Sequence, residues 1–252
     1  MKSTFLNHDT PLLTVMLQCE TPEVVIGRIR NANCLGADAY GLQIECLKPE
    51  YHNAESYKRI FEEMKGRPSY VTYYRGGSNE GKTDDELAKG LIHIAENGAT
   101  LVDVIGDLFC KHPQELTDNE EAIQKQMKLI DTIHQKGAEV LMSSHLYKYA
   151  PAERVLEIAL EQKRRGADII KIVTAADNME QQIENLRITD LLKKEFGAPF
   201  LFLSGGECAL HRRLGIKLGC CMVLCVYEHD SLSTPAQPLL STMKLVRDSI
   251  DF

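Results

Sequence analysis

The chain has 252 residues, 44% of them hydrophobic and 26% charged, so it can bury a substantial core and belongs with soluble globular proteins. Its formal net charge of −7 excludes a general binder of polyanions, which would present a basic face, and we expect no nucleic-acid partner. No stretch approaches about 18 consecutive apolar residues, and the first residues lack a signal-peptide core. We therefore expect a cytoplasmic protein that has no membrane partner.

Eight cysteines are scattered through the chain, mostly inside apolar segments, which is typical of reduced core residues and not of a disulfide framework. Cys220, Cys221 and Cys225 lie close together in the sequence, but their spacing is not that of a zinc knuckle. We expect them to belong to a core strand, and we expect neither a metal nor a cofactor.

Apolar runs of strand length alternate along the chain with segments that have helical features. The predicted strands are residues 12–17, 39–44, 69–74, 101–105, 139–143, 169–173, 200–203 and 221–226. The helical segments that follow them are residues 22–35, 53–65, 84–97, 119–136, 152–165, 179–195, 208–218 and 237–250. Start and stop signals support several of them, such as the capping box from Thr83 to Glu86 and the glycines Gly98, Gly137 and Gly166 just past helix ends.

Eight βα units joined by short turns favour a closed (β/α)8 TIM barrel, an α/β fold that forms a single catalytic domain over residues 1–252. A doubly wound open sheet is the alternative. It would normally carry a glycine-rich phosphate turn after its first strand, whereas that turn here reads Gln18-Cys19-Glu20-Thr21. In a barrel, chemistry lies where strands end and βα loops begin, so polar residues at those ends are the candidates for a site.

Lys171 is the strongest candidate because it stands alone in an apolar, β-branched run, residues 167–174. Burial removes hydration from an ammonium, which lowers its pKa and leaves part of the amine as a nucleophile of the kind that forms Schiff bases. The alternative is a lysine on an edge strand, whose ammonium returns to water along its apolar stem. His145 follows the preceding strand, so its imidazole could reach the same substrate as Lys171 and act as a base near neutral pH.

Further polar residues lie at the other strand ends. Arg75 ends an aromatic strand, where an unpaired guanidinium is costly, so it expects an anion from the substrate or from the protein. Glu80, in a glycine-bearing loop, could hold the second nitrogen of the histidine or could lie in solvent. Arg213 could clamp a carboxylate with two hydrogen bonds, and its neighbour Arg212 is expected in solvent. The remaining candidates are Gln43 and Glu45, together with Ser233 and Gln237 in a proline-braced loop that suits either a mobile lid or a plain βα loop.

These residues, in this order, resemble the type I 3-dehydroquinate dehydratases, the Schiff-base enzymes of the shikimate pathway. The resemblance runs over nearly the whole chain. It rests on Tyr74-Arg75 followed by Glu80-Gly81, on Met142-Ser-Ser-His145, on Asp168-Ile-Ile-Lys171-Ile, on Arg213-Leu214, and on Ser233-Thr-Pro-Ala-Gln237.

The resemblance implies a role for each matching residue. Lys171 corresponds to the imine-forming lysine, His145 to the acid/base, and Glu80 to the carboxylate that orients the histidine. The implied reaction converts 3-dehydroquinate to 3-dehydroshikimate: an iminium acidifies the adjacent C–H, and the histidine removes that proton and then protonates the departing hydroxyl. The implied substrate contacts are Arg213 as the carboxylate clamp, Arg75, Ser233 and Gln237.

The chain also departs from the family on two strands. Where the family shows Glu-x-Arg followed by Asp, this chain reads Gly41-Leu-Gln43-Ile-Glu45, and the family's Asp-x-Glu becomes Asp103-Val-Ile105. A polar pocket rejects a substrate whose groups it leaves unpaired, so these departures bear on the substrate.

Three hypotheses follow. The one we favour is a divergent 3-dehydroquinate dehydratase. The second is a Schiff-base dehydratase, retro-aldol lyase or aldolase that acts on a different carboxylate-bearing hydroxyketone, and the third is a non-catalytic paralogue that binds a carboxylated metabolite. In each case the partner is a small molecule, and we expect a homodimer because dimers are common among soluble oligomers.

Overall fold

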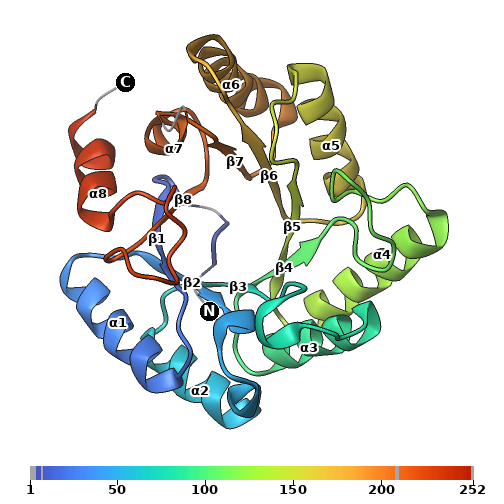
Figure 1. Cartoon of the computed structure of the whole chain (residues 1–252), viewed down its shortest axis with the longest axis vertical. Coiled ribbons are helices and arrows are strands. Elements are labelled where there is room, and N and C mark those ends of the chain that lie inside the picture. Colours follow the sequence, from blue (N-terminus) through green and yellow to red (C-terminus); the bar gives the residue numbers. More distant parts are fainter. Residues whose placement is uncertain (1–3, 7, 208–209, 251–252) are drawn as a thin grey trace.

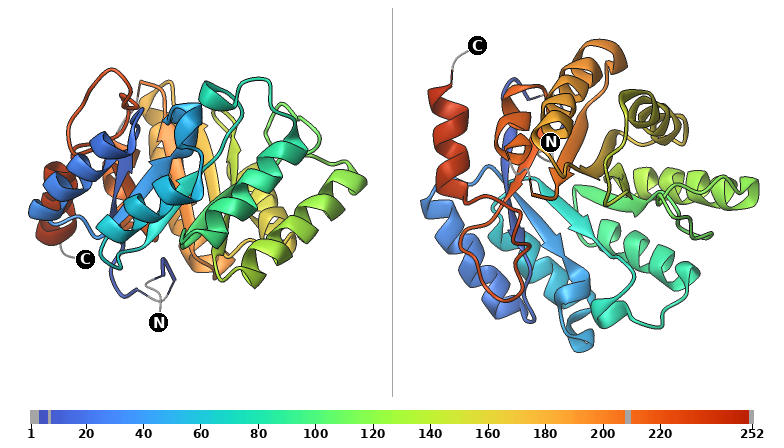
Figure 2. Two further views of the ribbon diagram at one scale, coloured as in Figure 1. Left: turned by 90° about the horizontal axis from the view of Figure 1, so that it is seen from below. Right: turned by 45° about the horizontal axis from the view of Figure 1, so that its top comes forward.

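The computed structural model of the protein describes residues 4–6, 8–207 and 210–250 (Figure 1). Within these residues, eight parallel strands form one sheet that curls into a barrel, and helices surround it (Figures 1 and 2). The predicted (β/α)8 barrel is confirmed. The strands are β1 Leu12–Leu17, β2 Ala39–Gln43, β3 Ser69–Thr72, β4 Leu101–Ile105, β5 Glu139–His145, β6 Ile169–Ala175, β7 Phe200–Gly205 and β8 Met222–Cys225. The helices are α1 Pro22–Cys34, α2 Ala54–Glu63, α3 Asp84–Glu96, α4 Glu120–Gln135, α5 Ala152–Arg164, α6 Met179–Leu191, α7 His211–Leu214 and α8 Leu240–Ser249.

The structure differs from the predicted element bounds mainly in the second half of the chain. Strands β5 and β6 continue past their predicted ends to His145 and Ala175, so His145 belongs to a strand and not to a loop. The predicted helix 179–195 ends in a π-helical turn before Gly197, which is in the left-handed region at φ 65°. The predicted helix 208–218 is reduced to α7 and a 3-10 turn, and its predicted start, Cys208, lies outside the described residues.

The register between β5 and β6 positions the site. Ser143 pairs with Lys171, and His145 pairs with Val173. Because side chains alternate between the two faces of a strand, Ser143, His145 and Lys171 all face the barrel interior. His145 therefore lies one layer closer than Lys171 to the carboxyl ends of the strands.

The barrel is nearly closed. Strand β1 pairs with both β2 and β8, and the ladders continue in sequence order from β2 to β7. In the described part of the chain β7 and β8 form no ladder, but a backbone hydrogen bond of 3.0 Å joins Cys221 N to Phe200 O. The β7–β8 side of the barrel is therefore held by fewer backbone bonds than the others.

Helix α3 illustrates how the outer layer forms. Its predicted capping box is present, and its buried residues Leu87, Leu91 and Ile94 recur at helical spacing, so one apolar face packs against the sheet. The strands supply the other half of this layer from their outward-facing residues, such as Val102 and Val104 of β4, which are fully buried. None of the helices among the described residues is long and apolar enough to cross a bilayer.

Candidate active site

Lys171 is buried at the centre of the barrel, with 4% of its surface exposed. Its Nζ donates to the hydroxyl oxygens of Tyr70 at 2.8 Å and Tyr74 at 2.9 Å, and to Oδ2 of Asp103 at 3.2 Å. Lysine as an ammonium has three N–H donors, and these three acceptors use all of them. The residue is therefore not an edge-strand lysine that returns its charge to water, but half of a buried ion pair with Asp103.

Asp103 gathers three hydroxyl donors as well as the amine. Both tyrosines donate to its Oδ2 at 2.5 Å, and Ser143 donates to its Oδ1 at 2.6 Å. Burial, together with the Asp103 carboxylate, raises the pKa of Tyr70 and of Tyr74 well above the usual value of 10. The phenols therefore keep their protons at neutral pH and act as donors to the carboxylate.

Gly41 makes room for this arrangement. A Cβ at this position would lie 2.1 Å from Sδ of Met16 and 3.2 Å from a ring carbon of Tyr70. A methionine and a tyrosine ring thus fill the space that a side chain at position 41 would take.

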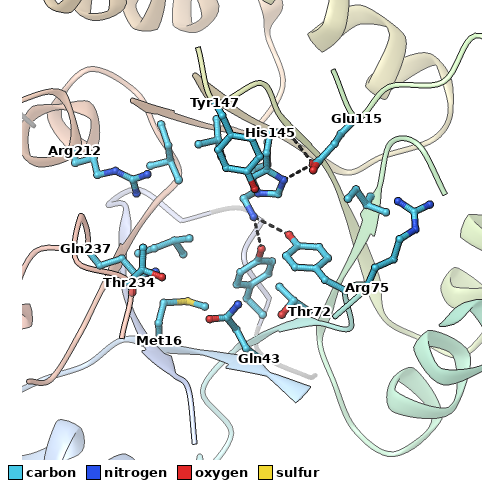
Figure 3. Close-up of a pocket in the computed structure, with 17 residues that line it drawn as sticks. Met16, Gln43, Thr72, Arg75, Glu115, His145, Tyr147, Arg212, Thr234 and Gln237 are labelled. Carbon is cyan, nitrogen blue, oxygen red and sulfur yellow. Dashed lines mark hydrogen bonds and ion pairs between the residues drawn. The ribbon is translucent and has the colours of Figure 1, made fainter. Parts of the chain in front are cut away.

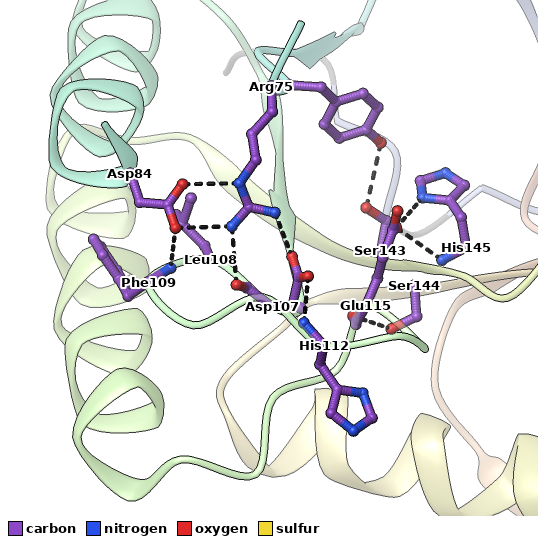
Figure 4. A network of polar contacts seen from close by, with 12 residues as sticks. Arg75, Asp84, Asp107, Leu108, Phe109, His112, Glu115, Ser143, Ser144 and His145 are labelled. Carbon is purple, nitrogen blue, oxygen red and sulfur yellow. Dashed lines mark hydrogen bonds and ion pairs between the residues drawn. The ribbon is translucent and has the colours of Figure 1, made fainter. Parts of the chain in front are cut away.

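His145 is held by Glu115. Oε2 of Glu115 accepts from the His145 backbone N–H at 3.0 Å and contacts Nδ1 of the ring at 2.5 Å (Figures 3 and 4). A carboxylate on Nδ1 fixes the tautomer that carries its proton there, which leaves Nε2 for a substrate. The ring also stacks on Tyr147 and meets Tyr74 edge to face at 5.6 Å.

Backbone conformation supports this clamp. Glu115 and Tyr147, which contact His145 from two sides, both have positive φ, 47° and 54°. Non-glycine residues hold such values only where their surroundings impose them, and such residues cluster at functional sites. The carbonyl of Glu115 also accepts a hydrogen bond from Ser144 at 2.8 Å, which anchors the loop to β5 (Figure 4).

The prediction that Glu80 orients the histidine is wrong. Glu80 is exposed after a 3-10 turn, and it is not among the described residues that line the cavity. The sequence pattern missed Glu115 because it lies 30 residues before His145 in a loop that joins β4 to α4. The one available signal was the length of that loop, residues 106–119, since long structureless loops in compact domains are commonly functional.

The anionic partners of Arg75 are two carboxylates of the protein, Asp84 and Asp107. Its guanidinium donates to both carboxylate oxygens of Asp84 at 2.8 Å, to Oδ1 of Asp107 at 2.7 Å and to the Asp107 carbonyl at 3.0 Å (Figure 4). The hydrogen bonds to Asp84 and Asp107 raise its pKa further above an already high value. Arg75 borders the cavity, but its guanidinium points away from the centre (Figure 3), so a direct substrate contact is not supported.

Arg212 lines the cavity, and Arg213 does not. The expectation that Arg212 would be solvated is therefore wrong. Its Nε donates to the carbonyl of Ser204 at 2.9 Å, and burial lowers its pKa to about 10. Within the described residues no carboxylate forms an ion pair with Arg212, so this partly buried guanidinium is suited to bind an anionic group of a ligand.

Gln43 and Glu45 lie in different places. Gln43 lines the cavity, and its Nε2 donates to Oε1 of Glu45 at 3.2 Å. Glu45 is buried behind it, where Thr72 donates to both carboxylate oxygens, and burial raises its pKa. Oε1 of Gln43 is buried without a partner among the described residues, so it offers an acceptor to a ligand.

The loop from β8 to α8 contributes Gln237 and Thr234 to the cavity, but Ser233 is not among the described residues that line it. The Ser233 hydroxyl instead bonds to the backbone of Asp230 within the loop. Thr234 is tied to Gln18 of the β1 end by two hydrogen bonds, at 3.1 and 3.2 Å. Oε1 of Gln237 is buried and has no partner in the described chain, so it is a second free acceptor.

Together these residues enclose a cavity of about 390 Å³ inside the carboxyl end of the barrel, a size suited to a small metabolite (Figure 3). Its polar groups include a buried amine, an imidazole, two amides, several hydroxyls and the Arg212 guanidinium, which has no carboxylate partner among the described residues. Among the described residues no cluster of three potential metal ligands is present.

The protein is a parallel (β/α)8 barrel, and its central cavity holds a buried lysine together with a histidine that a carboxylate holds in place. Comparison with known proteins makes the assignment specific: the family model of type I 3-dehydroquinase matches residues 13–250, and the chain belongs to that family.

Two curated relatives are similar over part of the chain. A 3-dehydroquinate dehydratase of Alkaliphilus oremlandii is 31% identical over 83 residues, 32% of this chain, and one of Syntrophotalea carbinolica is 32% identical over 79 residues, 31% of this chain. Each alignment spans 31% of the relative's length. The crystal structure of 3-dehydroquinate dehydratase from Geobacillus kaustophilus has a TM-score of 0.81 at 16% identity, covering 97% of this chain and 93% of that one, and shows the shared fold.

Proposed function

We propose that this protein is a Schiff-base-forming dehydratase, a carbon–oxygen lyase that converts 3-dehydroquinate to 3-dehydroshikimate in the shikimate pathway. The observation that carries the proposal is the buried amine of Lys171 opening into the same cavity as His145. Membership of the type I 3-dehydroquinase family supports the reaction and its substrate.

The geometry supports the following roles. Lys171 forms an imine with the ketone, and the protonated imine draws electrons from the adjacent carbon and acidifies its C–H. His145 uses Nε2 to remove that proton and then delivers it to the departing β-hydroxyl, while Glu115 holds Nδ1 and stabilises the imidazolium formed in between. Arg212 binds the substrate carboxylate in place of the expected Arg213.

The neutral amides favour hydroxyl groups on the substrate. The free oxygens of Gln43 and Gln237 accept hydrogen bonds and repel a second carboxylate, so the cavity suits one anionic group, opposite Arg212, with hydroxyls elsewhere. 3-Dehydroquinate has this character. A different hydroxyketone that carries one carboxylate has it too, and the neutral Gln43 is the observation that keeps this second hypothesis open.

Borohydride reduction tests the proposal. With 3-dehydroquinate present, mass spectrometry should show a reduced adduct on Lys171, and Lys171→Ala should abolish it while Lys128→Ala, which removes an exposed lysine of α4, should not. His145→Ala should still form the adduct but should not release the enone. Turnover of 3-dehydroquinate near background, by a protein that forms adducts with other carboxylated hydroxyketones, would favour the second hypothesis.

We also propose that the protein is a cytoplasmic homodimer. The seven described cysteines, all free thiols, are consistent with a reducing compartment. Light scattering measures the oligomeric state directly, and a monomer would contradict this part of the proposal.

A further inference from the structure

Tyr74 occupies a position that the reaction outlined above does not yet use. Its hydroxyl accepts from Lys171 Nζ at 2.9 Å and donates to Asp103 Oδ2 at 2.5 Å, so it lies between the amine and the carboxylate. Tyr74 is partly exposed, lines the cavity and touches the edge of the His145 ring. Its phenol is thus in contact with the reacting nitrogen and open to the space that a substrate carbonyl would occupy.

The resting amine is not ready to react. All three N–H groups of the Lys171 ammonium are engaged, and an ammonium has no lone pair with which to attack a carbonyl. The cavity must therefore take one proton from the amine before attack. It must also supply one proton later, when the carbonyl oxygen leaves as water.

We propose that Tyr74 and Asp103 form a proton relay that activates Lys171 and then expels water during imine formation. This inference rests on the proposed function, because it requires an imine at Lys171. It assigns to Tyr74 the role of a catalytic residue distinct from the histidine that carries out the elimination.

The relay balances without an outside acid or base. In the first step the ammonium proton moves to the Tyr74 oxygen while the Tyr74 proton moves to Asp103, which leaves a neutral amine and a neutral carboxylic acid. The amine nitrogen then bonds to the carbonyl carbon, the C=O pair moves onto oxygen, and Tyr74 carries a proton from nitrogen to that oxygen. In the last step the hydroxyl leaves as water with the proton stored on Asp103, and the nitrogen lone pair forms the iminium. An ammonium–carboxylate pair is converted to an iminium–carboxylate pair, so no net charge is created in the buried site.

Tyr70 provides a matched comparison. It makes the same two hydrogen bonds, to Lys171 at 2.8 Å and to Asp103 at 2.5 Å, from a position four residues earlier, inside β3, whereas Tyr74 follows the end of that strand. Tyr70 also lines the cavity, but it lies deeper in the barrel than Tyr74, and only 1% of its surface is exposed. Tyr70 can share in holding the ion pair, but Tyr74 is the phenol on the side from which the substrate enters.

The test is the rate of adduct formation in single turnover, with 3-dehydroquinate and borohydride quenching at successive times. General acid–base catalysis contributes about 10²- to 10⁴-fold, so Tyr74→Phe should slow the appearance of the Lys171 adduct by about 10²-fold or more and still reach the wild-type amount. Tyr70→Phe should slow it much less. Tyr73→Phe, which removes a hydroxyl bonded to Lys82 and His52 outside the barrel, should leave the rate unchanged.

The outcomes separate the relay from the function on which it rests. If wild-type protein forms no adduct, both proposals fail; if wild type and Tyr74→Phe form it equally fast, or Tyr70→Phe and Tyr74→Phe slow it equally, the relay alone fails. Thermal unfolding checks that the variants are folded. If Tyr74→Phe is unstable, Asp103→Asn tests the same relay at the group that stores the proton. An amide accepts hydrogen bonds but cannot store the proton, so adduct formation must again be slow.

Discussion

Replacing Glu115 with glutamine tests the clamp on His145. One carboxylate oxygen serves both the backbone N–H and Nδ1 of His145, and an amide oxygen can take the same two bonds, so the tautomer and the ring position should be kept. What the variant loses is the negative charge beside the imidazolium that forms when His145 accepts a proton. The side chains of His145 and Glu115 are only 13% and 22% exposed, so solvent screens this charge weakly.

The magnitude follows from the value of a charged hydrogen bond. Such bonds contribute about 1.5–3 kcal/mol, compared with about 1 kcal/mol for neutral ones, and each 1.36 kcal/mol is tenfold in rate. Losing the difference predicts a fall in kcat of about 2- to 30-fold for Glu115→Gln. The borohydride adduct on Lys171 should form normally, because the imine step does not use this charge.

The matched control is Glu80→Gln, which removes the exposed carboxylate that the sequence pattern favoured. It should leave kcat within twofold of wild type, about 0.4 kcal/mol or less. Steady-state assay of enone formation measures both variants, and thermal unfolding confirms that they are folded. A normal rate for Glu115→Gln together with a large loss for Glu80→Gln would refute the assignment of Glu115.

Three further predictions address recognition and stability. Arg212→Ala should raise KM for a carboxylated substrate by about 10- to 100-fold, the value of a charged hydrogen-bonded contact, whereas Arg213→Ala should change KM far less. Initial-rate measurements give both KM values, and a larger effect of Arg213→Ala would restore the sequence-based assignment. Gly41→Ala should cost about 1–3 kcal/mol in urea unfolding, because the new methyl group overlaps a methionine sulfur, while Gly27→Ala, in open space on α1, should be neutral or stabilising. Burial raises the pKa of Glu139 to about 7. An acid with a raised native pKa stabilises the fold below its unfolded pKa and loses that contribution as pH rises, so the free energy of unfolding of wild type relative to Glu139→Gln should fall between pH 4.5 and 7. A difference in unfolding free energy that does not change with pH would contradict this prediction.

The sequence was sufficient for the fold and for the centre of the site because both depend on periodic patterns. Strand alternation places Lys171 and His145 on the interior face of neighbouring strands, and the eight βα units leave a barrel as the natural closed arrangement. The expectation that Arg75 must meet an anion also holds, because it follows from the cost of burying an unpaired guanidinium.

The predictions that failed concern residues whose positions no periodic sequence pattern determines. Glu115 reaches His145 from a long loop whose path depends on tertiary contacts, so sequence spacing carries no information about that meeting. The choice between Arg212 and Arg213 depends on the phase of a helix, and α7 has four residues, too few for an amphipathic pattern to define which side faces inward. Adjacent residues on a helix point about 100° apart, so an error of one position exchanges a residue that lines the cavity for one that does not.

Gly41 on β2, where the chain departs from the family pattern, packs as one unit with Tyr70 on β3. A side chain at position 41 and the ring of Tyr70 compete for the same space, since a Cβ there would lie 3.2 Å from that ring and would overlap Met16. Restoring an acidic residue at 41 would therefore displace the phenol that holds Lys171 and Asp103, and would place a second carboxylate beside a buried ion pair already satisfied by the first. Gly41 thus belongs to the arrangement that holds Lys171 and Asp103 together, and the function proposed above assigns substrate recognition to Arg212 and to the neutral amides.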